Sequence, residues 1–99
     1  MPTNRRSDNR LGINLRARWD GISGQQDTRI SDISLGGCYV DSLSRVDIGE
    51  FVPLEIELPS GEWLQLRGEV TSFQEGVGFG LKFSSLTEAE KAALNQLVG

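Results

Sequence analysis

The stretch FVPLEIELPSGEWLQLRGEVTSF, residues 51–73, decides the fold class of this chain. Apolar side chains alternate with glutamate in its first half, which is the period-two pattern of a strand buried on one face. These apolar positions are Val52, Leu54, Ile56 and Leu58. PSGE at 59–62 is a turn signal, and a second alternating segment follows it. The stretch therefore predicts two strands joined by a turn, with Pro53 at a sheet edge or in a bulge.

Similar alternation governs much of the rest of the chain. The further expected strands are INLRARW (13–19), TRISDI (28–33), CYV (38–40) and FGLKF (79–83). Residues 41–50 read as a polar loop that holds one or two apolar anchors. Six or so short strands with frequent turns predict an antiparallel barrel or sandwich, and a barrel is favoured because closure removes exposed edges. We expect Trp19 and Trp63 to be core or lid residues, with Trp63 off the face of its neighbours.

The period changes near the carboxyl end, where LTEAEKAALNQLV (86–98) predicts a helix. Thr87 and Glu90 have the capping-box spacing that marks a helix start. The expected apolar face consists of Leu86, Ala89, Ala93, Leu94 and Leu97. So short a helix is marginal alone, so we expect this face to dock on the barrel. A partner or membrane contact is the alternative, but Lys91 is the only basic residue on the polar face.

Composition narrows the class of protein further. The 99 residues suit one domain, and no apolar run approaches the length of a membrane span. The polar amino-terminal end has no hydrophobic signal segment, and Cys38 is the single cysteine, so we expect a cytoplasmic protein with Cys38 as a small buried residue. The chain contains no histidine, which removes the commonest general base and metal ligand. We therefore expect no catalysis and no metal or cofactor.

Positive charge is concentrated at one end of an acidic chain. The net charge is −4, yet RRSDNR (5–10) contributes Arg5, Arg6 and Arg10, and five of the ten basic residues lie in the first 18 positions. Guanidinium groups bind phosphate oxygens and guanine edges through paired hydrogen bonds. A frayed basic tail explains the same pattern. RRSDNR alone therefore leaves a tail and an anion site open.

DISLGG (32–37) is the second candidate stretch. Asp32 and Ser34 alternate around Ile33, so we expect both side chains on the face opposite Ile33, away from the core. Gly36 and Gly37 allow a tight turn and a close approach. A carboxylate and a hydroxyl beside such a turn match the edge of a base, guanine above all. An Asx or serine turn that closes a hairpin is the alternative.

Together the two stretches resemble a known family. Arg6-x-x-x-Arg10, followed some twenty residues later by Asp32-x-Ser34-x-x-Gly37, is similar to the signature of the PilZ domain family. GVGFGLKF (76–83) and the terminal helix also resemble that family. The resemblance implies a six-stranded antiparallel β-barrel with a carboxyl-terminal helix, preceded by an arginine arm at 1–10, the domain itself filling 11–99.

The resemblance also implies the ligand, which is the bacterial second messenger cyclic di-GMP. In this interpretation Arg6 and Arg10 clamp phosphates and guanine, and Asp32 and Ser34 hold the other guanine. Arg5, directly before the motif, favours an intercalated pair of ligand molecules. The ligand-binding set is Arg5, Arg6, Arg10, Asp32, Ser34, Gly36 and Gly37.

The implied function is that of a receptor or adaptor that changes conformation on binding and regulates a downstream effector protein in motility, exopolysaccharide or biofilm control. Two alternatives remain: a protein-interaction adaptor whose arginines do little, and a small barrel that binds single-stranded nucleic acid. Residues 19–99 are acidic, which disfavours nucleic acid. Arg16, Arg18 and Arg29 either add ligand contacts or form a solvated face.

Overall fold

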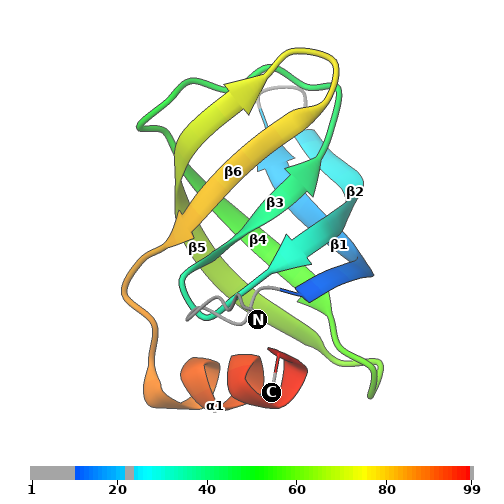
Figure 1. Cartoon of the computed structure of the whole chain (residues 1–99), viewed down its shortest axis with the longest axis vertical. Helices are drawn as coiled ribbons and strands as arrows, with labels where there is room; N and C mark the ends of the chain where they lie inside the picture. Colours follow the sequence, from blue (N-terminus) through cyan, green and yellow to red (C-terminus); the bar gives the residue numbers. More distant parts are fainter. Residues whose placement is uncertain (1–10, 22–23, 99) are drawn as a thin grey trace, which may run out of the picture.

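The chain folds into a closed antiparallel β-barrel with a carboxyl-terminal helix, as the sequence predicts. The computed structural model describes residues 11–21 and 24–98. The elements are β1 (Leu11–Gly21), β2 (Gly24–Ile33), β3 (Gly37–Asp41), β4 (Phe51–Glu57), β5 (Trp63–Gln74), β6 (Gly78–Phe83) and α1 (Glu88–Val98). Around the barrel the strands follow the order β1-β2-β3-β6-β5-β4, and every neighbouring pair is antiparallel (Figure 1).

The barrel interior is filled by the apolar side chains that the alternation assigns to it. Trp19 and Phe79 pack edge to face, with ring centroids 5.2 Å apart. The fully buried members include Ile30, Ile33, Val40, Ile56 and Val70. Val46 is the buried anchor of the loop between β3 and β4, whereas Leu43 and Ile48 of the same loop are exposed. The prediction of a core Trp19 is thus confirmed.

Trp63 is not a core residue. Its neighbour Leu64 packs against the core, and Trp63 itself lies half-buried on the outer face of β5 beneath two arginines. The expectation that it lies off the face of its neighbours is therefore confirmed, and the expectation of a core or lid position is wrong. The physical reason is that the guanidinium groups of β1 cover the indole from outside, which a single strand's pattern does not reveal.

The seam between β1 and β4 closes the barrel. Its register pairs join Ala17 to Ile56, Arg18 to Glu55 and Trp19 to Leu54. Pro53 lies one residue beyond the last of these pairs, where β4 has β5 as its paired neighbour. A residue without an N–H is tolerated where a strand is paired on one side only, which accounts for Pro53 at this position of a closed barrel.

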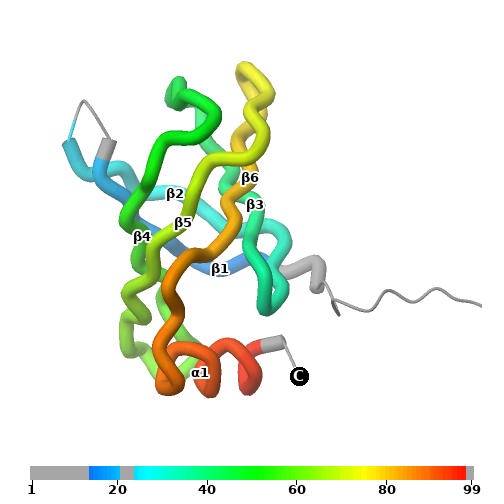
Figure 2. Tube along the Cα trace, turned by 90° about the vertical axis from the view of Figure 1, so that its left-hand side faces the viewer, coloured from blue at the N-terminus to red at the C-terminus, as the bar shows by residue number. Residues whose placement is uncertain are grey.

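Helix α1 lies across one end of the barrel in both views (Figures 1 and 2). The capping box forms as predicted, because the Thr87 amide donates to the Glu90 carboxylate at 2.9 Å and the Glu90 amide to the Thr87 hydroxyl at 3.1 Å. Leu94 is fully buried, and Leu86 and Leu97 pack against the core. Ala89 is exposed, so its assignment to the docking face is wrong: the eleven-residue helix begins at Glu88, and its buried side is centred on Leu94.

Candidate ligand-binding face

A bulge in β2 sets the direction of the DISLGG motif. Ile30 pairs with Val40 on β3 and Asp32 pairs with Tyr39, so Ser31 has no counterpart. Both Ile30 and Ile33 are buried although they are three residues apart. The simple alternation expected for TRISDI is therefore wrong at Ser31, because a bulge places two residues of one strand against one of the next.

Ser34 forms the turn that joins β2 to β3. The Ser34 amide donates to the Gly37 carbonyl at 2.9 Å, and the Gly36 amide donates to Ser34 Oγ at 3.2 Å. Ser34 is 2% exposed, so the serine turn is confirmed, and the expectation of a side chain directed away from the packed interior is corrected. The cause is local: the hydroxyl folds back on the turn, as serine hydroxyls do at such sites. A role of Ser34 in binding must therefore coexist with its role in the turn.

The two glycines of the motif differ in what surrounds them. A Cβ on Gly37 would lie 2.0 Å from the Leu81 carbonyl oxygen, so strand β6 of the same chain makes the close approach. A Cβ on Gly36 would meet only Ser34 Oγ, at 3.8 Å. Gly37 is thus required for packing β3 against β6, whereas Gly36 is exposed beside the motif.

The expected arginines Arg5, Arg6 and Arg10 lie outside the described residues. The strand that follows them begins beside the motif, since Leu11 pairs with Ile33 and Gly12 with Asp32. The point at which the arginine segment joins the barrel is therefore next to Asp32.

Asp32 belongs to a row of residues that crosses four strands on the outside of the barrel. The register pairs are Asp32 with Tyr39, Tyr39 with Gly80, and Gly80 with Ser72. Residues paired in this way point to the same face of a sheet. Figure 1 shows β2, β3, β6 and β5 side by side in this order.

Tyr39 is the member of this row that sequence reasoning missed. It is half-buried, and its hydroxyl donates to Gln74 Oε1 at 2.6 Å. Burial, followed by the nearby charge of Asp41, raises the pKa of the Tyr39 phenol above its usual value. The alternate glycines of GVGFG could have predicted this position, because a strand without side chains on one face leaves room for an aromatic side chain from the neighbouring strand.

The other arginines considered from the sequence are engaged within the chain. Arg18 forms an ion pair with Glu55 at 3.0 Å, and its guanidinium lies 3.7 Å from the centroid of the Trp63 ring. Arg16 contacts Glu57 at 3.5 Å, and Arg29 donates to Asn14 Oδ1 at 3.2 Å. Arg16 and Arg18 therefore belong to the outer surface of the β1–β4 seam, away from the Asp32 row.

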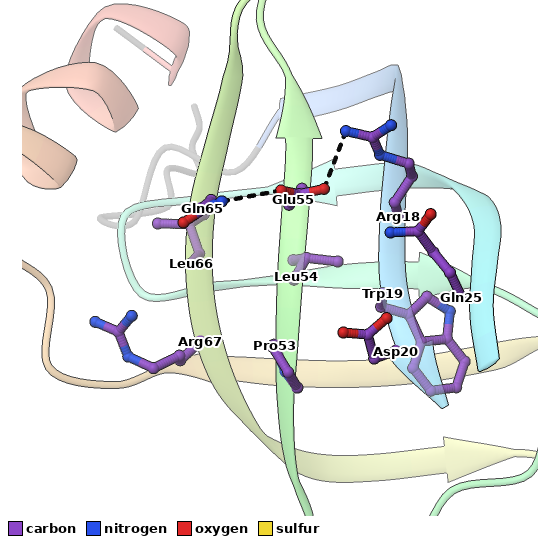
Figure 3. Close-up of a pocket in the computed structure, with 10 residues that line it drawn as sticks. All are labelled: Arg18, Trp19, Asp20, Gln25, Pro53, Leu54, Glu55, Gln65, Leu66 and Arg67. Atoms are coloured by element: carbon purple, nitrogen blue, oxygen red, sulfur yellow. Dashed lines mark hydrogen bonds and ion pairs between the residues drawn. The ribbon is translucent and has the colours of Figure 1, made fainter. Parts of the chain in front are cut away.

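A pocket of about 320 Å³ also lies at this seam (Figure 3). Glu55 is central to its wall, because it forms an ion pair with Arg18 and accepts a hydrogen bond from Gln65. Asp32 and Ser34 do not line it. Arg18 and Glu55 of its lining pair with each other, and Arg67 pairs with Glu90 outside the pocket.

Within residues 11–21 and 24–98, no group of three acidic or cysteine side chains is arranged to hold a metal ion. In the same part of the chain, α1 is neither long nor apolar enough to span a bilayer.

Comparison with protein families and with known proteins gives one family match. Residues 4–99 match the PilZ domain family. None of the curated proteins matches this sequence.

Solved structures share the fold at low sequence identity. The Bacillus subtilis inhibitor of motility, MotI/DgrA, has a TM-score of 0.75 and 21% identity over 97% of this chain. The PilZ domain of Escherichia coli YcgR, solved with c-di-GMP, has a TM-score of 0.76 and 13% identity over 96%. The PilZ domain of CeSA from a cellulose-synthesizing bacterium has a TM-score of 0.67 and 18% identity over 90%.

The lengths of these proteins differ. This chain spans 50% of MotI/DgrA and 44% of a longer E. coli YcgR chain, but 89% and 93% of the separate PilZ domains of YcgR and CeSA. It therefore corresponds to the PilZ unit that larger proteins also contain.

Proposed function

The chain belongs to the PilZ domain family, and from this premise we propose that it is a receptor for cyclic di-GMP. The observation that carries the proposal is the combination of both signature motifs with the start of β1 beside Asp32. The solved complexes of E. coli YcgR and Borreliella burgdorferi PlzA with c-di-GMP support it, since both share this fold.

The chemistry of the motif fits a guanine edge. The Asp32 carboxylate is an acceptor for the N1–H and N2–H₂ donors of guanine, and such charge-assisted hydrogen bonds are stronger than neutral ones. Ser34 and the exposed backbone at Gly36 lie at the end of the same strand. Gly37 contributes by letting β3 lie close against β6.

The arginines complete the site from the amino-terminal side. Arg6 and Arg10 supply planar cations for the phosphates, which carry the negative charge of the ligand. Arg5 favours a second, stacked ligand molecule. Because Leu11 directly follows Arg10 and pairs with Ile33, the arginines are attached at the edge of the Asp32 row.

Binding of one ligand by both the amino-terminal segment and the barrel would allow the receptor to signal to an effector protein. A ligand that joins residues 1–10 to the barrel changes the surface that an effector protein meets. We propose a non-catalytic cytoplasmic regulator of this kind, acting on motility, exopolysaccharide or biofilm formation through an effector.

Calorimetry with cyclic di-GMP tests the proposal. We expect the wild type to bind with micromolar or tighter affinity, with little binding of GMP or an oligonucleotide. Arg10→Ala and Asp32→Asn should each weaken binding at least tenfold, that is by about 1.4 kcal/mol or more. Asp27→Asn is the matched control, because it removes the same charge from an exposed position of the same strand.

The outcomes separate the alternatives. A wild type that gives no heat at high ligand concentration refutes the receptor and favours an adaptor. Binding of the oligonucleotide in preference to cyclic di-GMP favours the nucleic-acid barrel. A stoichiometry of two per chain supports the role given to Arg5, and a stoichiometry of one contradicts it.

A further inference from the structure

The outer face beside Asp32 contains an aromatic ring laid over glycine. Tyr39 pairs in register with Asp32 on one side and with Gly80 on the other. A Cβ built on Gly78 would lie 2.9 Å from Tyr39 Cε2, and one built on Gly80 would lie 3.9 Å from Tyr39 Cδ1. Cε2 and Cδ1 are opposite corners of the ring. The ring therefore extends over β6, in space that a side chain on Gly78 would occupy and in ordinary contact distance of Gly80.

The ring is also held in this orientation. Its hydroxyl donates to Gln74 Oε1 at 2.6 Å, and Gln74 pairs with Gly78 on the strand that the ring crosses. One end of the side chain is thus fixed by β3 and the other by β5. An aromatic ring with few free torsions, fixed at both ends, loses little conformational freedom when a ligand packs on it.

We propose that Tyr39 is the stacking platform for the guanine whose edge Asp32 holds. This inference rests on the proposed function and adds a residue outside both signature motifs. Tyr39 lies between Asp32 on β2 and Gly80 on β6, so a base that lies on the ring and extends back over β3 brings its edge toward the carboxylate. Stacking is tolerant of base identity because every base has a π-face, whereas a carboxylate selects for hydrogen-bond donors. Tyr39 therefore supplies affinity and Asp32 supplies the preference for guanine.

The chain offers a direct probe, because Tyr39 is its single tyrosine. Selective labelling of tyrosine gives one set of ring signals in an NMR spectrum of the wild type. We expect cyclic di-GMP to shift these signals upfield, because a stacked purine places them in its shielding region. Saturating cyclic di-GMP that binds but leaves the Tyr39 signals unmoved overturns the inference.

Variants test the same point through affinity. Tyr39→Leu should weaken cyclic di-GMP binding about tenfold. Tyr39→Phe keeps the ring and loses only the hydrogen bond to Gln74, so it should retain most of the affinity. Phe51→Leu is the matched control, since it makes the same kind of change at a 67% exposed aromatic residue on β4.

The results distinguish this inference from the function on which it rests. No binding by the wild type refutes both. Binding by the wild type together with unchanged binding by a folded Tyr39→Leu refutes the platform alone. Should Tyr39→Leu fail to fold, as judged by its thermal transition, the spectrum of the wild type and the affinity of Tyr39→Phe decide the question.

Discussion

Arg18 and Arg16 differ in how much each is expected to stabilise the β1–β4 seam that closes the barrel. Both lie on the outer face of β1, and both guanidinium groups face the Trp63 ring. Arg18 lies 3.7 Å from the ring centroid with its side chain 32% exposed, whereas Arg16 lies at 5.7 Å and is 59% exposed. We predict that Arg18→Ala destabilises the fold far more than Arg16→Ala.

The magnitude follows from the contacts. A partly desolvated guanidinium over an indole is worth about 1 kcal/mol, and its 3.0 Å ion pair with Glu55 adds up to about 1 kcal/mol at this exposure. Arg18→Ala should therefore lower the free energy of unfolding by about 2 kcal/mol, which corresponds to roughly 10 °C in Tm for a domain of this size. Arg16→Ala should change it by less than about 0.5 kcal/mol, because its contacts are longer and more solvated.

Urea denaturation followed by circular dichroism measures both variants. A double-mutant cycle of Arg18→Ala with Trp63→Leu should give a coupling energy of about 1 kcal/mol, and the Arg16 cycle should give much less. Equal losses for the two arginines, or no coupling between Arg18 and Trp63, would refute the reasoning.

The remaining predictions concern other parts of the fold. Gly37→Ala should lower the free energy of unfolding by about 3 kcal/mol or prevent folding, because its Cβ would lie 2.0 Å from a backbone oxygen, whereas Gly36→Ala should cost less than about 1 kcal/mol in the same urea experiment. Thr87→Ala should cost about 1 kcal/mol and speed amide exchange in the first turn of α1, and unchanged exchange would contradict the cap. Absorbance titration should give Tyr39 a pKa above the ordinary 10.0, and Asp41→Asn should lower it only partly since burial is the larger cause. Because the pKa of Tyr39 is raised in the folded state, its contribution to stability is present below pH 10 and is lost as the pH rises through the raised pKa, so unfolding that is insensitive to pH there would argue against it.

The strands, the helix start and one turn of this protein could be predicted from its sequence. Sequence patterns located part of every strand, although β2 begins at Gly24 rather than at the expected residue 28, and the spacing of Thr87 and Glu90 located the helix start. PSGE located the turn between β4 and β5. Each of these depends on residues within a few positions of one another, so a single chain segment contains the whole signal. The order of the arginine and DISLGG motifs likewise suggested the family.

The bulge at Ser31 and the position of Ser34 could not be read in this way. TRISDI alternates in sequence, yet Ile30 and Ile33 are both buried in the core. The reason is that β3 pairs with β2 in a register in which Ser31 is a bulge residue without a partner on β3. Ser34 looked like a partner of Asp32 on an open face, and the turn buries it instead. Both outcomes depend on the register in which β3 pairs with β2 and on the turn that joins these strands.

The sequence by itself determined which segments form strands, where the helix begins and in which order the two motifs follow each other along the chain. The tertiary structure alone decided which residues meet across strands. Tyr39 and Gly80 are separated by forty residues and become neighbours because the barrel places β3 beside β6. Trp63 is covered on the outside of the barrel because β1 brings Arg18 over it when the sheet closes. Alternation follows from the backbone geometry of each strand, whereas strand order and register follow from closing the whole sheet around one core.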